Sequence, residues 1–179
     1  MRRRKSQPTD PKTPDLYRAP IISERLIIRE ATRSDAPALE STMAAAGLAE
    51  GERTADGARR FGAGHAEVPM WTATRAVCEK GSARVVGGVV LTEVDVPTSD
   101  APRIGWWLDA EDAHYAGELV EAVVQRLHQL GAEAIVMQVR VDDEAAIAVA
   151  EAAGFRRGDA VRHTNQAGVD LDFWQYSRP

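Results

Sequence analysis

The sequence predicts one α/β domain of mixed α+β type, with a central mixed, mostly antiparallel sheet of six or seven strands flanked by about four helices. Segments in which apolar and polar residues alternate predict strands, and apolar residues three or four positions apart predict helices. The predicted strands gather as hairpins beside one strand–helix–strand crossover, unlike a Rossmann or barrel repeat. A chain of 179 residues, 44% of them hydrophobic, is long enough for one such domain.

The first elements are a strand, a helix and a weaker helical segment. A strand is predicted at 21–30, where β-branched residues are enriched. Ser34 and Asp35 come next and can cap a helix over 36–47, which is rich in helix formers. A short helix is predicted near 54–61, inside a stretch without a strong period.

Three apolar segments follow in the middle of the chain. Those at 71–77 and 84–92 flank Glu-Lys-Gly-Ser, whose residues favour a turn, so they are predicted to pair as an antiparallel hairpin. A short strand with two tryptophans follows at 104–108, and the polar stretch 109–116 is predicted to be a loop.

The last third of the chain completes the sheet. Apolar residues at three- and four-residue spacing predict a helix over 117–130, and alternation predicts a strand over 134–141 with one apolar face. An alanine-rich helix at 144–153 ends before a glycine. Two final strands, at 160–164 and 170–177, flank Asn-Gln-Ala-Gly and are predicted to form a hairpin.

The charge is distributed unevenly along the chain. Residues 1–20 carry six of the 22 Lys and Arg residues but two of the 27 Asp and Glu residues, so residues 21–179 carry 16 basic and 25 acidic residues, net −9. We expect 1–20 to be a basic, proline-containing flexible tail and 21–179 to be the domain. An acidic domain disfavours nucleic-acid binding and attracts cationic ligands. The tail is either an extension without a role or a contact for RNA or anionic surfaces.

The cysteine content and the hydropathy pattern indicate a cytoplasmic protein. A lone cysteine, Cys78, allows no internal disulfide, and no Cys and His cluster has the spacing of metal ligands, so no metal is predicted. No apolar run approaches the roughly 20 residues that span a bilayer, and no apolar segment follows the amino-terminal charges. We therefore expect no membrane association.

The most informative stretch is 104–124, where a strand passes through a loop into a helix. The first amides of a helix lack intrahelical partners and can bind an anion such as a pyrophosphate. Gly117 leaves room for close approach to the backbone, whereas Glu118 places a negative charge beside the site. The alternative is an ordinary strand-to-helix connection.

Several motifs together indicate a family. They are Ser23-Glu-Arg-Leu-Ile-Ile-Arg with the following Ser34-Asp35, then Ile104-Gly-Trp-Trp-Leu-Asp, the pair Glu121-Ala122, and Glu151-Ala-Ala-Gly-Phe-Arg-Arg. In their order and spacing the chain resembles the GNAT acyltransferase superfamily, particularly its ribosomal-protein N-terminal acetyltransferase-like branch, over about residues 21–178.

The resemblance implies a GNAT-like fold and acetyl-CoA as cosubstrate. Pantetheine is expected along Trp107 and Leu108, and the pyrophosphate at backbone amides of the following loop. That loop comprises His114, Tyr115, Ala116, Gly117, Glu118 and Leu119. The family pattern there is Gln or Arg, two residues, Gly, one residue, then Gly or Ala, so His114 and Leu119 depart from it.

The resemblance also points to the helix at 144–153. The family often has an Asn where this chain has Asp143, which is therefore expected near the cofactor. A family Ser or Tyr that could protonate the departing thiolate corresponds here to Ala146 or Ala150. Solvent can complete that protonation, and positioning supplies much of the acceleration.

Acetyl transfer to an amine requires a base, because the nucleophile must be neutral. Candidates for proton transfer are His163, Glu93 and Tyr176. Their alternative interpretations are, respectively, an exposed strand histidine, the first solvated residue after a strand, and an aromatic packed in a strand. An acidic group, Asp109, Glu111 and Asp112, either recognises an amine or is a solvated turn.

The resulting hypothesis is an acetyl-CoA-dependent N-acetyltransferase acting by direct attack on an amine of a small molecule or peptide amino terminus. The resemblance implies that an amide near Leu108 polarises the thioester carbonyl. The alternative is a catalytically degenerate acyl-CoA-binding or regulatory protein of the same fold. The oligomeric state is open, with a homodimer as one option.

Overall fold

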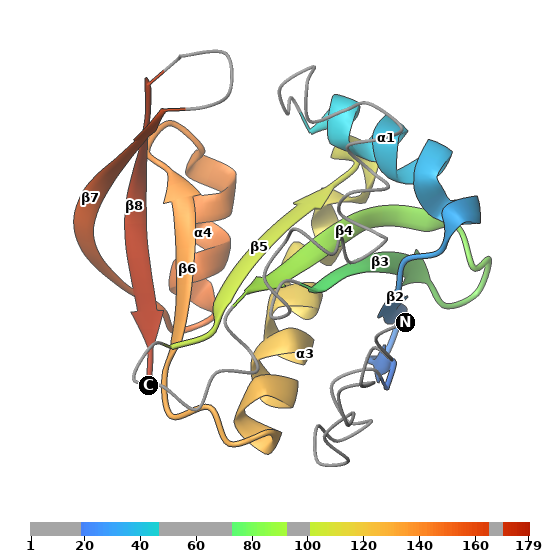
Figure 1. The fold of residues 1–179 in the computed structure, drawn as a ribbon, viewed down its shortest axis with the longest axis horizontal. Helices are drawn as coiled ribbons and strands as arrows, with labels where there is room; N and C mark the ends of the chain where they lie inside the picture. The colour runs from blue at the N-terminus through green and yellow to red at the C-terminus, as the bar shows by residue number, and fades with distance from the viewer. Residues whose placement is uncertain (1–18, 47–72, 93–100, 165–169) are drawn as a thin grey trace, which may run out of the picture.

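The computed structural model describes residues 19–46, 73–92, 101–164 and 170–179, which form one eight-stranded sheet with helices on both faces (Figure 1). The strand order is β1-β2-β3-β4-β5-β6-β8-β7. Among these strands only β5 and β6 pair in parallel, which confirms the predicted mixed, mostly antiparallel sheet.

The strand count exceeds the predicted six or seven because the first predicted strand is two strands. β1 (Ile21–Ile22) and β2 (Leu26–Glu30) pair antiparallel around a turn in which the Ser23 amide donates to the Leu26 carbonyl over 3.0 Å. The other strands are β3 (Ala73–Glu79), β4 (Val85–Thr92), β5 (Arg103–Leu108), β6 (Ile135–Arg140), β7 (Arg156–Thr164) and β8 (Asp170–Arg178).

Three α-helices lie within the described residues, against the four predicted. They are α1 (Ala36–Ala45), α3 (Ala116–Gln129) and α4 (Glu144–Ala152). The helix predicted near 54–61 and the turn after 164 lie outside the described residues. Two 3-10 helices, η2 (Arg33–Asp35) and η4 (Ala110–Tyr115), precede α1 and α3, so the loop predicted at 109–116 is wrong.

The core has two parts, one on each face of the sheet. On one face α3 buries the apolar stripe that its spacing predicted, against Ile135, Met137 and Val139 of β6. On the other face α1 covers a smaller cluster with Leu39 and Met43. The strand predicted over 134–141 was expected to bury Val141 on the same face. That prediction is wrong, because β6 ends at Arg140 and Val141 is 38% exposed.

Buried polar contacts connect α1 to the sheet. Asp35 accepts two hydrogen bonds from the Arg29 guanidinium, both 2.8 Å, and one from the Thr32 amide at 2.7 Å. The Arg29 contact is the main reason that the pKa of Asp35 lies well below its usual value. The charged pair therefore fixes the start of α1 to β2.

Two adjacent glycines in β4 allow a tryptophan to cross the sheet surface. A Cβ on Gly88 would overlap the indole ring of Trp107, and one on Gly87 would overlap the Trp107 carbonyl oxygen. The indole Nε1 donates to Thr42 Oγ1 of α1 over 3.0 Å. Trp107 therefore joins α1, β4 and β5, and two glycines within a strand are a sequence signal of such a close approach.

This packing predicts a different cost for alanine at two sheet glycines. We expect Gly88→Ala to lower the free energy of unfolding by about 1–3 kcal/mol, because the indole must move out of a packed site. Gly105→Ala, on the neighbouring strand, places its Cβ where no described atom lies within 4 Å, and we expect a change below about 0.5 kcal/mol. Urea unfolding followed by circular dichroism measures both, and equal losses would contradict the packing argument.

Candidate active site

The parallel strands β5 and β6 separate after two residue pairs. They pair at Arg103↔Val136 and Ile104↔Met137, whereas β4 pairs with every residue of β5 from Arg103 to Leu108. Residues 105–108 therefore stay joined to β4, while β6 beyond Met137 continues to pair with β8, and Figure 1 shows β5 and β6 diverging. The carboxyl ends of both strands lie on this splayed side, and η4 with α3 follows one of them while α4 follows the other.

Backbone amides of β5 point toward the side that β6 has left. The Asp109 amide donates to the Val86 carbonyl over 2.9 Å, on the β4 side. Because backbone N–H groups alternate between the two edges of a strand, the Trp107 amide also faces β4. The amides of Trp106 and Leu108 consequently face the parted edge.

The side chains of the two predicted pantetheine contacts are buried on opposite faces of the sheet. Trp107 is 7% exposed and packs in the cluster under α1, while Leu108 is 6% exposed and belongs to the core under α3. Trp106 is half-buried on the α3 side. A ligand beside these strand residues would therefore contact mainly their backbone N–H and C=O groups.

The predicted phosphate loop is the junction of η4 and α3. Its central residue, Gly117, is exposed, and a Cβ there would meet no described atom within 4 Å. Leu119, the bulky departure from the family pattern, is fully buried in the core and does not cover Gly117. Ala116 is buried, and its amide already donates to the Ala113 carbonyl.

The two aromatic rings before the glycine lie in different surroundings. His114 is exposed, with Nδ1 3.3 Å from the Glu111 carbonyl oxygen, and its ring centroid lies 4.0 Å from that of Tyr115. Tyr115 is buried, and its hydroxyl donates to Glu79 Oε1 over 2.8 Å. Neither ring therefore fills the space where a Cβ on Gly117 would lie.

The Glu118 carboxylate is engaged by the β1–β2 turn. It accepts hydrogen bonds from Ser23 Oγ at 2.6 Å, the Arg25 amide at 2.7 Å and Arg25 Nε at 2.8 Å. Burial raises the pKa of Glu118, but these hydrogen bonds outweigh it and the pKa is lowered. The negative charge expected beside Gly117 is thus paired with the Arg25 cation, a contact across 93 residues that no local sequence pattern signals.

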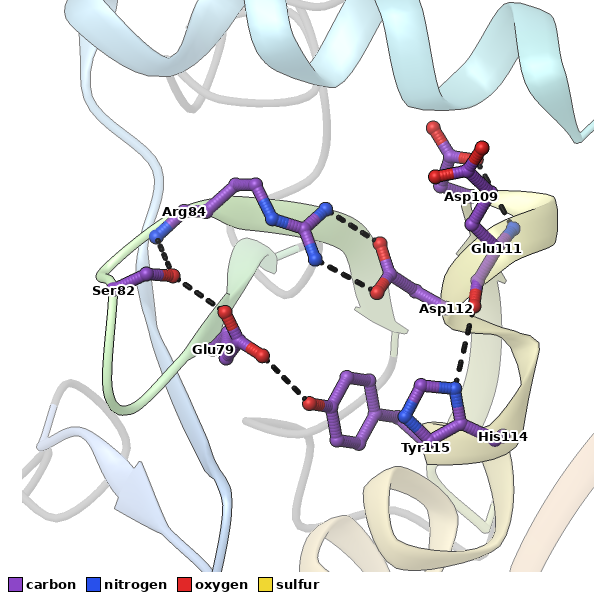
Figure 2. Close-up of polar contacts among 8 residues, drawn as sticks. All are labelled: Glu79, Ser82, Arg84, Asp109, Glu111, Asp112, His114 and Tyr115. Atoms are coloured by element: carbon purple, nitrogen blue, oxygen red, sulfur yellow. Dashed lines mark hydrogen bonds and ion pairs between the residues drawn. The ribbon is translucent and has the colours of Figure 1, made fainter.

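The three acidic residues considered for amine recognition do not act together. Asp112 is buried and accepts two hydrogen bonds from the Arg84 guanidinium, at 2.7 and 2.8 Å (Figure 2). Asp109 is the N-cap of η4 and accepts from the Glu111 amide. Glu111 is exposed. Asp112 is therefore already neutralised by Arg84.

The candidates for proton transfer lie in different places. Tyr176 is fully buried opposite Met137, where β5 and β6 are still joined. Its hydroxyl accepts from Arg157 Nε at 2.9 Å and lies 3.2 Å from Glu151 Oε1. Tyr176 is thus an aromatic residue packed within a strand, the second of the two interpretations given for it. Glu93 lies outside the described residues.

His163 lies at the splayed end of the sheet. Its backbone is in β7 opposite Leu171, beyond the pair that joins Phe173 to Arg140, the last residue of β6. Asp143 also lies at this end, where its carboxylate accepts from the Ala146 amide at 2.9 Å and caps α4. The structure therefore brings His163, Asp143 and the η4–α3 junction to one end of the sheet and leaves Tyr176 elsewhere.

Two other features of the described residues concern metals and membranes. Within the ranges that the structure describes, no three His, Cys, Asp or Glu side chains come together as a metal site. No helix in those ranges is long and apolar enough to cross a membrane.

Similarity to known proteins was found at the level of a family and of solved structures. Residues 25–156 match the family model of the acetyltransferase (GNAT) domain. Comparison with curated protein sequences found no match.

The fold is shared with solved acetyltransferases. A ribosomal L7/L12 alpha-N-protein acetyltransferase in complex with coenzyme A has a TM-score of 0.72 and 20% identity, covering 89% of this chain and 97% of that one. A ribosomal-protein-S5-alanine acetyltransferase from Vibrio fischeri has a TM-score of 0.71 and 15% identity, covering 89% and 96%. A GNAT-family acetyltransferase from Bacillus anthracis has a TM-score of 0.71 and 18% identity, covering 89% and 98%.

The family match spans most of the domain, and the structural likeness confirms the predicted fold class. This protein therefore belongs to the GNAT acetyltransferase family and, as the sequence predicted, is an acetyl-CoA-dependent N-acetyltransferase.

Proposed function

We propose that the protein acetylates the α-amino group of a peptide or protein, by direct attack of the neutral amine on the thioester of acetyl-CoA. The observation that carries the proposal is the separation of β5 from β6 after Ile104, which leaves the Trp106 and Leu108 amides facing an edge that β6 does not occupy. In such a position a strand amide can hold an extended pantetheine arm. The Leu108 amide can also donate to the thioester carbonyl oxygen as negative charge develops there.

The η4–α3 junction is the proposed binding site for the pyrophosphate. Gly117 supplies space for close approach, and α3 directs the positive end of its dipole to the same place. Burial of Tyr115, Ala116 and Leu119 anchors this segment to the core. Pairing of Glu118 with Arg25 reduces repulsion of an anionic ligand.

A peptide amino terminus is the favoured acceptor. Two proteins that share the fold are acetyltransferases of ribosomal proteins, and the acidic domain attracts a cationic amino terminus. His163 is the proposed base, because its backbone lies at the splayed end and histidine is the residue type that most often serves as a general base. Glu93 is the second candidate for the base.

The acceptor class predicts which substrates release coenzyme A. With acetyl-CoA and a panel of peptides that differ at the first residue, we expect release of free thiol, with the acetyl group located on the α-amino nitrogen by mass spectrometry. The same peptides blocked by an N-formyl group are the matched control and should give no release. Turnover with small-molecule amines alone would contradict the peptide acceptor. Tight acetyl-CoA binding by calorimetry without any turnover would instead support the degenerate binding protein.

The pyrophosphate site predicts an effect of bulk at Gly117. We expect Gly117→Val to raise KM for acetyl-CoA at least about tenfold, because a branched side chain occupies the space needed for close approach to the backbone, while kcat changes little. Ala148→Val, which places the same branched side chain on the exposed surface of α4, is the control and should leave KM unchanged. An unchanged KM in Gly117→Val would place the pyrophosphate elsewhere.

The proposed base predicts a loss of rate without a loss of binding. We expect His163→Gln to lower kcat about 100-fold at neutral pH with KM for acetyl-CoA unchanged, since general-base catalysis contributes about 10²–10⁴. His128→Gln changes a histidine whose Nδ1 lies 2.9 Å from the Ala132 carbonyl oxygen, near the end of α3, and should retain full activity. Full activity in His163→Gln, with a loss in Glu93→Gln, would assign the base to Glu93.

A further inference from the structure

We propose that the β3–β4 hairpin positions the pyrophosphate-binding segment, with Arg84 and Glu79 as the positioning residues. The inference rests on the proposed function, because it assigns a role to residues that support the η4–α3 junction. Both residues lie at the hairpin end, Glu79 as the last residue of β3 and Arg84 just before β4. Each contacts one buried residue of the junction (Figure 2).

The first connection is the pair of Arg84 with Asp112. Two parallel hydrogen bonds of 2.7 and 2.8 Å join the guanidinium to a carboxylate that is 5% exposed, while the Arg84 side chain is 51% exposed. The fork geometry fixes the orientation of η4 as well as its distance. The guanidinium is the main cause of the lowered pKa of Asp112, so this carboxylate is charged at neutral pH.

The second connection runs through Glu79. Its Oε2 accepts from Ser82 Oγ at 2.6 Å and its Oε1 from the Tyr115 hydroxyl at 2.8 Å. The Ser82 hydroxyl in turn accepts from the Arg84 amide at 3.2 Å, so one chain of hydrogen bonds includes both positioning residues. The contacts with Ser82 and Tyr115 lower the pKa of Glu79, which therefore accepts both bonds as a carboxylate at neutral pH.

The junction depends on these external contacts because η4 has little stability of its own. A 3-10 helix of six residues has strained hydrogen bonds and is too short to persist alone. The Asp109 amide bond to Val86 fixes its beginning, Asp112 its middle and Tyr115 its end. All three contacts lead to the same hairpin, so the hairpin fixes the position of η4, the segment that leads to the amides around Gly117.

Arg84 also has an electrostatic effect that a purely structural contact would lack. Asp112 lies five residues before Gly117, and its charge is neutralised by Arg84. Loss of Arg84 leaves the buried Asp112 carboxylate as an unpaired anion in the segment that would bind another anion, whereas loss of the Asp112 charge leaves an unpaired cation there. The two single substitutions should therefore have unequal effects on an anionic ligand, although each breaks the same pair.

The test measures acetyl-CoA kinetics and amide exchange in the full chain. We expect Arg84→Gln to raise KM for acetyl-CoA about tenfold with kcat within about twofold, and Asp112→Asn to raise KM less than about threefold. Arg84→Lys keeps the charge but not the fork, and should fall between Arg84→Gln and the unsubstituted protein. In hydrogen–deuterium exchange, amides of 110–118 should exchange faster in Arg84→Gln.

Arg157→Gln is the matched control. Arg157 pairs with Glu151 at 2.6 Å, is exposed to a similar extent at 43%, and contacts no residue of the junction. Equal KM changes in Arg84→Gln and Asp112→Asn, or the same change in Arg157→Gln, would overturn the positioning role.

The exchange measurement separates this inference from the proposed function. If the unsubstituted protein does not bind acetyl-CoA, the proposed function fails. If exchange over 110–118 is the same with and without Arg84, the hairpin does not hold the segment and the inference fails, whether or not acetyl-CoA binds.

Discussion

The hydrogen-bond register of β5 is the constraint on which the site depends. β5 has two edges, and along residues 105–108 β4 occupies one edge while β6 leaves the other. A strand edge that is parted inside a sheet presents backbone donors and acceptors in a fixed direction, which a loop does not do. The packing of both faces maintains this arrangement, because Trp107 holds β5 to β4 and α1, while α3 covers the opposite face. The core and the site therefore arise from the same strand.

Local charge pairing resolves an apparent conflict between an acidic domain and an anionic cosubstrate. Residues 21–179 carry a net charge of −9, yet two carboxylates of the η4–α3 segment, Glu118 and Asp112, are paired with arginines. Arg25 neutralises Glu118 and lies 4.8 Å over the ring of Tyr115, and Arg84 neutralises Asp112. In each pair the carboxylate is largely buried and the arginine side chain is about half exposed, so loss of the arginine leaves a poorly solvated negative charge. Their importance is local, because each neutralises a carboxylate of the segment that would bind a pyrophosphate.

The sequence predicts well what depends on local periodicity. The apolar stripe of α3, the alternation of β6 and the hairpin of β3 and β4 lie close to the expected residues. It fails where tertiary contacts override local pattern. β7 begins four residues before its predicted start because an irregular register between Arg157 and Ala160 breaks the alternation.

In the site, too, features set by local pattern could be predicted and features set by tertiary contacts could not. The resemblance identified Gly117 and Leu108 as candidates, and burial of Leu119 could be read from the spacing of α3. The pairs of Arg25 with Glu118 and Arg84 with Asp112 could not be predicted, since they join residues far apart in the chain and arise only when the sheet has formed.

The amino-terminal end of α4 bears on how the reaction is completed. Where the family pattern has side chains near the departing sulfur, this chain has Asp143, which caps the helix by accepting from the Ala146 amide, and Ala150, which is fully buried. Methyl groups at Ala146 and Ala150 cannot protonate a thiolate, so in the proposed reaction the thiolate takes its proton from solvent. A coenzyme A thiolate is a stable enough leaving group for this, and the rate then depends on alignment of amine and thioester and on polarisation of the carbonyl. In the proposed site the backbone of β5 aligns the thioester and polarises its carbonyl.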